Sequence, residues 1–140
     1  MPASVSYRLD PDLKKRLSER ARVEGVTETS LVERLLDEAL KIAAHPGVVY
    51  RGGPAGRRAA LAGGPDVWEV VVSLRHSGKR GEARVRAAAE QLGLPERLVR
   101  IAVAFASAHP DEIDTMIVRN EAAAARAEKA ARDRERLLTS

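Results

Sequence analysis

Residues 4–40, SVSYRLDPDLKKRLSERARVEGVTETSLVERLLDEAL, decide the fold of this chain. They read as one alternating segment followed by two short helical patterns, which Gly25 separates. One strand and two helices in about 40 residues cannot bury a core alone, and domains of that size usually need metal, disulfides or a second copy. The chain has no cysteine, which excludes disulfides and thiolate metal sites. We therefore expect this segment to pair with a second copy of itself.

The alternation in residues 4–9 gives the expected strand an apolar and a polar face. The polar face carries Ser4, Ser6 and Arg8. If two copies pair as an antiparallel ribbon, this face is presented twice and fits the major groove of DNA, where arginine can bond guanine and serine several base edges. The alternative is an ordinary half-buried edge strand with a solvated polar face.

Capping residues mark the two helices that follow. Asp10 is a good N-cap, Pro11 suits the first helical position, and Gly25 suits the end of the first helix. In that helix Leu13, Leu17 and Ala21 mark a buried face. The second helix carries an apolar stripe wide enough to touch both the first helix and a partner chain: Leu31, Val32, Leu35, Leu36, Ala39 and Leu40.

The start of the second helix is an expected phosphate clamp. Free amides there lie beside the hydroxyls of Thr27, Thr29 and Ser30.

Residues 4–40 resemble the ribbon-helix-helix family of dimeric DNA-binding proteins, of the Arc, MetJ and CopG type. The resemblance rests on the alternating strand, the DPDL run at residues 10–13, the GVTETS run at residues 25–30 and the Leu/Val-rich second helix. It implies base reading by Ser4, Ser6 and Arg8 and phosphate binding around Thr29 and Ser30. One departure is charge, because residues 1–44 hold eight Lys/Arg and eight Asp/Glu.

Composition limits the classes that the whole chain can belong to. A net charge of +4 with a pI near 9.8 favours an acidic partner. Aromatic residues make up only 3%, so we expect an aliphatic, alanine-rich core. No run approaches the ~20 apolar residues of a membrane span, and the chain starts directly with the expected strand rather than a signal peptide. We expect a cytoplasmic protein with no membrane contact.

The middle of the chain opens a new unit. Residues 48–51 read as a strand, residues 52–56 as a turn and residues 57–62 as a returning strand, which together make a hairpin. Asp66 is placed to cap a helix over residues 67–76. The paired glycines do not complete a phosphate-binding loop signature, so we expect turns there and no nucleotide site.

Two helical patterns, residues 82–92 and 95–108, carry helix-turn-helix spacing. In this spacing Ala89 is the small residue where the helices cross, Gly93 is the glycine of the turn, and Val99 is the apolar residue that packs the second helix. The recognition helix would begin near Pro95. Its outward candidates would be Glu96, Arg97 and Arg100, although an acid at that position is a poor phosphate contact. The alternative is a helical hairpin that serves packing or partner binding.

Positive charge gathers in the middle of the chain, where residues 51–86 hold eight Lys/Arg and three Asp/Glu. This window, extended into the second helix of the pair, is a possible second DNA contact. Its candidates are Arg57, Arg58, Lys79, Arg80, Arg97 and Arg100. The alternative is a solvated basic surface.

Residues 45–120 resemble a small domain found in VapB-like antitoxins. The resemblance rests on HPGVV at residues 45–49, PDVW at residues 65–68, and the ending GLP at residues 93–95 through HPDEID at residues 109–114. It implies a PIN-like ribonuclease toxin as partner. One departure is the hairpin, where residues 57–64 replace a Pro-Val-Ile-x-Gly-Thr stretch. By analogy, the long helix expected over residues 111–138 would be the part that wraps the toxin.

The polar clusters do not indicate catalysis or metal binding. The HPDE run at residues 109–112 is expected to start a helix, with its proline first and its acids in the first turn. Three scattered histidines and no cysteine make a metal site improbable. We expect a non-enzyme without cofactors.

The sequence as a whole predicts a mainly α protein. We expect three parts: residues 1–44, a ribbon-helix-helix homodimerisation and DNA-binding domain; residues 45–110, a hairpin with a helix-turn-helix-like module; and residues 111–140, a helical tail. The expected function is a dimeric repressor that acts as the antitoxin of a type II toxin-antitoxin system. The alternatives are a stand-alone regulator or plasmid-partition factor, and a toxin-binding module without specific DNA binding.

Overall fold

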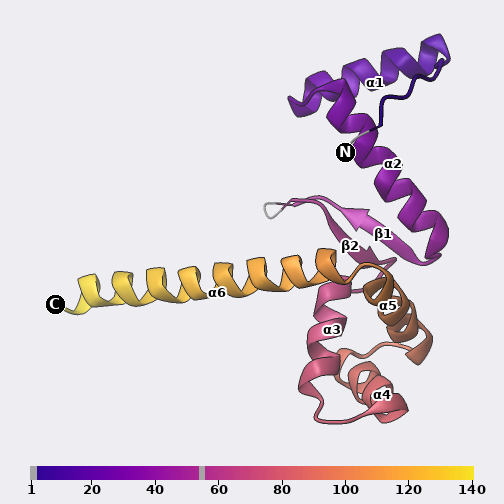
Figure 1. Cartoon of the computed structure of the whole chain (residues 1–140). Helices are drawn as coiled ribbons and strands as arrows, with labels where there is room; N and C mark the ends of the chain where they lie inside the picture. The colour runs from indigo at the N-terminus through magenta and orange to yellow at the C-terminus, as the bar shows by residue number, and fades with distance from the viewer. Residues whose placement is uncertain (1–2, 54–55) are drawn as a thin grey trace. The chain divides into compact units, whose positions relative to one another are not determined.

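The computed structural model describes residues 3–53 and 56–140. Within these residues the chain is mainly helical, with one small two-stranded antiparallel sheet (Figure 1), which confirms the expected class. The chain forms two compact units, residues 1–43 and residues 44–140. Two residues of the turn expected at residues 52–56 lie outside the described part.

The first unit contains α1 (Pro11–Glu24) and most of α2 (Glu28–Ala44). Asp10 caps α1 as expected, because its Oδ2 accepts hydrogen bonds from the amides of Asp12 (3.1 Å) and Leu13 (3.3 Å). Gly25 ends α1 in the left-handed conformation, with φ 68° and ψ 33°, which a residue without Cβ adopts at least cost. These two residues fix both ends of α1.

The buried face expected in α1 forms only in part. Ala21 is buried, whereas Leu13 is exposed and Leu17 is half-buried. Among the described apolar residues of this unit, only Ala21 and Leu31 are fully buried. A two-helix unit of this size has too little facing surface to enclose more, so most of its apolar stripe stays open.

Residues 3–10 form neither helix nor strand and are exposed throughout. The single chain therefore lacks the strand expected at residues 4–9, because a strand needs a hydrogen-bonding neighbour and nothing in the described chain pairs with this segment. The two-chain ribbon stays a prediction.

The second unit opens with a hairpin. β1 (Val48–Arg51) and β2 (Arg58–Leu61) pair antiparallel, with Val48 opposite Leu61 and Arg51 opposite Arg58. The helices α3 (Val67–His76), α4 (Gly81–Leu92), α5 (Glu96–Ala108) and α6 (Pro110–Thr139) follow. All lie within a few residues of the ranges that the sequence predicts.

A single aliphatic core joins the hairpin to these helices around one buried aromatic ring, Phe105. The ring lies within 6.4 Å, centroid to centroid, of His45, Tyr50 and His109. The largest fully buried partners in this unit are Val48, Leu61, Val67, Val70 and Val99. The rest of the core is largely alanine and valine, as the composition predicts.

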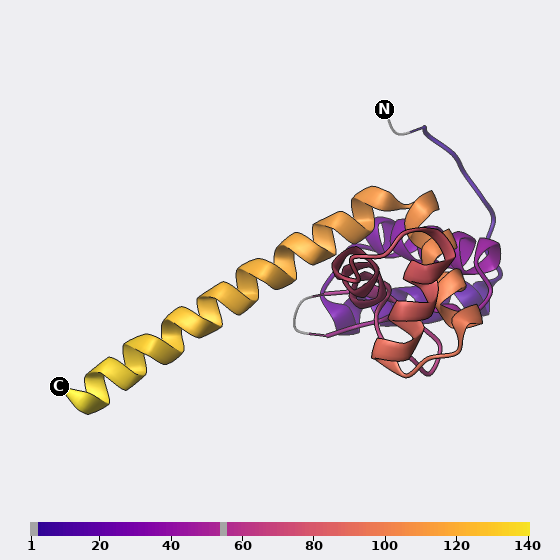
Figure 2. The same ribbon diagram turned by 90° about the horizontal axis from the view of Figure 1, so that it is seen from below.

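Only the first turns of α6 belong to this core. Ile113, Met116 and Ile117 are buried, whereas nearly every residue after Asn120 is exposed. Figures 1 and 2 show the helix leaving the other elements of its unit as a single rod. The start of the expected tail therefore belongs to the core, whereas nearly all of its last 20 residues are exposed.

Candidate nucleic-acid interface

The three expected base-reading residues lie in the extended N-terminal segment. Ser4, Ser6 and Arg8 are all exposed. Their neighbours are exposed as well, with Val5 at 68% and Tyr7 at 80%. Both faces of the alternating segment are therefore largely in solvent, and no described residue of the segment is buried.

The expected phosphate-binding residues gather at the start of α2. Thr27 Oγ1 accepts a hydrogen bond from the amide of Ser30 (3.1 Å), and Ser30 Oγ donates to the carbonyl oxygen of Thr27 (3.0 Å). Thr27 Oγ1 therefore caps the helix, while Thr29 is exposed and neither hydrogen bond uses its side chain. The first amides of a helix have no acceptor inside it, and Thr27 already accepts from the amide of Ser30, so the amides of Glu28 and Thr29 are the ones that can take an anion.

An ion-pair cluster locks α1 to α2 next to this turn. Arg34 donates from both terminal nitrogens to Glu24, at 2.9 and 3.1 Å, and Arg20 Nε donates to the same carboxylate at 2.6 Å. The guanidinium of Arg34, followed by that of Arg20, lowers the pKa of Glu24 to about 2. A bidentate pair fixes orientation as well as distance, so it sets the angle at which α2 leaves the turn.

A second acid at the start of α2 is also paired. Glu28 accepts hydrogen bonds from the Lys14 ammonium and from Ser18 Oγ (2.5 Å). These contacts, the Lys14 one first, lower the pKa of Glu28. The lysine offsets a negative charge beside the expected phosphate clamp. Sequence reasoning missed this pairing, because residues 14 apart on two different helices leave no local pattern.

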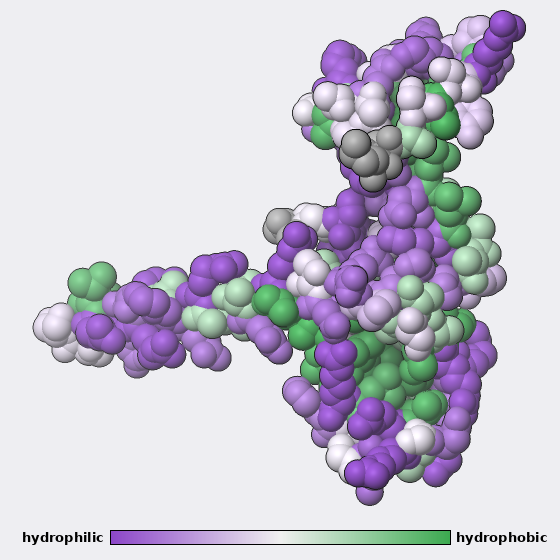
Figure 3. Space-filling view, in the orientation of Figure 1, coloured by the Kyte–Doolittle hydropathy of each residue, from purple (hydrophilic) through white to green (hydrophobic). Residues whose placement is uncertain are grey.

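The apolar stripe of α2 is the largest uncovered apolar feature of the first unit. Leu35 is 44% exposed, Leu36 55% and Leu40 70%. Figure 3 shows apolar residues along one side of α2. Of the expected stripe only Leu31 is fully buried and Val32 is half-buried, while Leu35, Leu36, Ala39 and Leu40 are exposed.

In the second unit, two arginines of the hairpin are held by structure. Arg58 Nε donates to Asp66 Oδ2 at 2.5 Å, and Trp68 Nε1 donates to the same oxygen at 3.1 Å. Arg51 donates to the carbonyl oxygens of Gly64 (2.9 Å) and Leu61 (2.8 Å). The charge of Arg58 is therefore already compensated at Asp66, which weakens it as a candidate for DNA contact.

The remaining candidate contacts lie on and before the α4–α5 pair. Lys79, Arg80 and Arg97 are exposed and form no ion pair within the described residues. Arg100 is engaged: it pairs with Glu82 across the two helices, with one nitrogen at 3.1 Å, and with Glu96 at 3.6 Å. The pairing lowers the pKa of Glu82.

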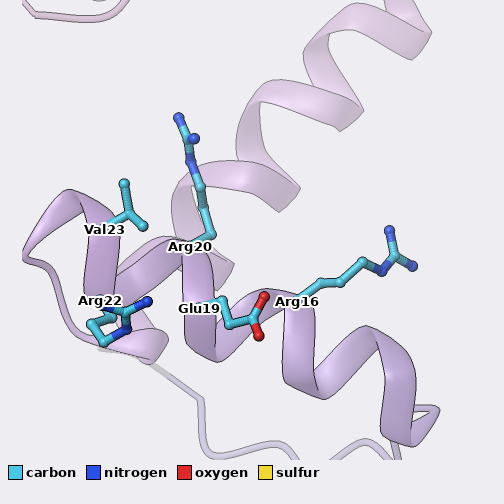
Figure 4. A pocket seen from close by; sticks show the side chains of 5 residues that line it. All are labelled: Arg16, Glu19, Arg20, Arg22 and Val23. Carbon is cyan, nitrogen blue, oxygen red and sulfur yellow. The ribbon is translucent and has the colours of Figure 1, made fainter.

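The polar residues at the start of α6 serve its first turn and a contact with the hairpin. No group of three or more metal-ligating side chains occurs among the described residues. Pro110, Asp111 and Glu112 occupy the first turn of α6, and Glu112 accepts a hydrogen bond from Tyr50 Oη (2.8 Å). The pocket in Figure 4 is a surface depression lined by side chains of α1 alone. None of the helices described has the length and apolar character that a membrane crossing requires.

Comparison of the chain with protein-family models, with curated proteins and with solved structures found no match. The functional assignment therefore rests on the residues and geometry described above.

Proposed function

We propose that this chain is a dimeric DNA-binding repressor whose N-terminal segments pair into an antiparallel ribbon, and that it acts as the antitoxin of a type II toxin-antitoxin system. The observation that carries the proposal is the uncovered apolar surface of the first unit, which runs along α2 and recurs on one face of the N-terminal segment.

The first unit is incomplete as a monomer. Its apolar residues are only partly enclosed, and there is no disulfide in the chain to compensate. A second copy would cover both apolar surfaces. The two α2 stripes can pack together, and the apolar face of the paired N-terminal segments, formed by Val5, Tyr7 and Leu9, can cover the helices. The same pairing supplies each N-terminal segment with the hydrogen-bonding neighbour that it lacks.

Pairing also places Ser4, Ser6 and Arg8 of both copies on the outward face of the ribbon. A two-stranded ribbon fits the major groove, where Arg8 can bond guanine at O6 and N7 and the serines can bond either donors or acceptors. The amides and hydroxyl at the start of α2, around Thr29, would then hold a flanking phosphate. Because residues 1–44 have equal numbers of positive and negative side chains, most of the affinity must come from these specific contacts.

The antitoxin role rests on the last 20 residues of α6. A lone helix of this length is marginal in water, and this part is rich in Ala, Arg and Glu with an apolar end at Leu137 and Leu138. An exposed helix of this kind gains stability when a partner covers one side of it. We place the contact with the toxin, a PIN-like ribonuclease, on this segment.

The test is a mobility shift with the full chain on its own upstream DNA and on unrelated DNA, across a salt series. Arg8→Ala is expected to abolish the preference for upstream DNA, while the protein stays dimeric by sedimentation. Arg22→Ala is the matched control, because Arg22 is an exposed arginine of the same unit that lies outside the ribbon. Retained preference in Arg8→Ala would reject the ribbon as the DNA reader, leaving a dimeric toxin-binding module as the better description.

A further inference from the structure

We propose that α3, α4 and α5 form a second DNA-binding module, a helix-turn-helix that binds double-stranded DNA through α5 and the basic start of α4. The inference goes beyond the proposed function, because it concerns different residues in the other unit. It rests on three observations: the turn geometry, the burial pattern and the distribution of unpaired charge.

The turn between α4 and α5 is short and tightly fixed. α4 ends at Gly93 in the left-handed conformation, φ 65° and ψ 37°, and the amides of Gly93 and Leu94 both bond to the carbonyl oxygen of Ala89, the latter at 2.9 Å. Pro95 is extended, with φ −61° and ψ 144°, and α5 begins at the next residue. A three-residue turn that starts with glycine is typical of a helix-turn-helix.

Small residues line the place where the two helices meet. Ala88 and Ala89 in α4 and Val99 and Ala102 in α5 are all buried. α3 packs against both helices, and Ser73 Oγ in α3 bonds to Gln91 Oε1 in α4 at 2.5 Å. The spacing of Ala89, Gly93 and Val99 predicted this motif, and the structure gives each of the three the environment that the motif requires.

The first turns of α5 present one open face. Glu96, Arg97, Arg100 and Ala104 are exposed, whereas the opposite side of the helix is buried. In a helix-turn-helix the N-terminal residues of the second helix contact base edges, and the first helix crosses the backbone. Arginine can bond guanine and glutamate can accept from cytosine, so the side chains on this face suit base contacts.

Unpaired positive charge lies beside this face. Five cations lie in the α3–α4 loop, in α4 and at the start of α5: Lys79, Arg80, Arg84, Arg86 and Arg97. None of the five forms an ion pair with a carboxylate within the described residues, and Arg84 alone of them donates to a backbone carbonyl there, from Nε to the oxygen of Lys79 at 3.1 Å. By contrast Arg51, Arg58 and Arg75, earlier in the unit, are engaged by Asp66, backbone carbonyls and Asp114. Charge complementarity therefore favours a polyanion at α4 and α5.

The two acids on this face do not exclude DNA. Glu82 and Glu96 hold Arg100 in exposed ion pairs, which contribute little and are screened by salt. A phosphate can replace these carboxylates as the partner of Arg100. Removal of one acid should accordingly strengthen DNA binding, which gives the proposal a gain-of-affinity test.

The experiment measures binding of the full chain to a fluorescent 30-bp duplex of unrelated sequence by anisotropy, from about 0.05 to 0.3 M salt. The double variant Arg86→Ala/Arg97→Ala should bind the duplex about 10- to 60-fold more weakly at 0.1 M salt. It should also reduce the slope of log K against log salt by about 2, because each of the two lost phosphate contacts contributes about 0.9 to that slope. Glu96→Gln should strengthen binding.

The matched controls remove the same charges from the exposed part of α6: Arg126→Ala with Arg132→Ala, and Glu128→Gln. Circular dichroism checks that every variant keeps its helix content. Equal effects in the α6 controls and the α4–α5 variants would overturn the proposal, since the effect would then be one of net charge alone.

Repeating the measurement with Arg8→Ala separates the two modules. If Arg8→Ala leaves binding to unrelated DNA intact while the Arg86 and Arg97 changes weaken it, the second module stands. The ribbon proposal is then judged separately, by whether Arg8→Ala loses the preference for upstream DNA. If only Arg8→Ala weakens binding, the second module is rejected and the ribbon proposal stands.

Discussion

Leu36→Ala tests the dimer on which the proposed function depends. Leu36 is 55% exposed in the single chain, so slightly more than half of its side-chain burial remains to be gained from a partner. Full burial of a leucine contributes about 1.5–3 kcal/mol, so the part still available is about 0.8–1.6 kcal/mol per protomer and about twice that in a symmetric dimer. The dimer dissociation constant should then rise about 10- to 200-fold, because each tenfold change corresponds to about 1.4 kcal/mol.

Sedimentation velocity over a protein concentration series measures this constant directly. Alanine has the highest helix propensity, so the substitution removes apolar surface without weakening α2 itself. Val23→Ala is the control: Val23 is 68% exposed and lies on the far side of α1 from its buried Ala21. An unchanged dissociation constant in Leu36→Ala, or an equal rise in Val23→Ala, would refute the α2 stripe as the dimer interface.

Two further predictions concern the charge clusters. Glu24→Gln should flatten the loss of stability on acidification: the carboxyl has its pKa lowered from 4.5 to about 2 in the folded chain, so its contribution is complete above pH 4.5 and is lost as the pH falls towards 2. Thermal melts of both proteins between pH 6 and 2.5 check this, and parallel profiles would show that the pairing with Arg34 contributes nothing. Asp66→Asn should lower the unfolding free energy of the second unit by about 1.5–3 kcal/mol, because it weakens charged hydrogen bonds from Arg58 and Trp68. Urea unfolding followed by Trp68 fluorescence measures the change, and a loss well under 1 kcal/mol would contradict a structural role for this cluster.

Most helix and strand boundaries could be predicted because the signals for them are local. Asp10 with Pro11, Gly25, Asp66 and Gly93 act through their own backbone angles or through residues within about four positions, and each acts where the sequence placed it. The hairpin was predictable for the same reason, because two short strands flanked a glycine-rich turn.

The distribution of charge was less predictable. The sequence marked Arg58 and Arg100 as possible DNA contacts, but Asp66 and Glu82 engage them across 8 and 18 residues. Conversely, the sequence did not single out Arg86, which is exposed on α4 and forms no ion pair within the described residues.

The sequence by itself determined the mainly helical class, the order of the elements and the aliphatic character of the core, since propensity, capping and periodicity are properties of neighbouring residues. Only the tertiary structure decided which apolar side chains are enclosed and which charges are compensated. Leu31 is buried while Leu36 of the same expected stripe remains open, because five residues turn an α-helix by about 140° and Leu36 therefore faces away from the side that carries Leu31. Burial and ion pairing depend on distances between segments far apart in the chain, and no local pattern encodes those distances.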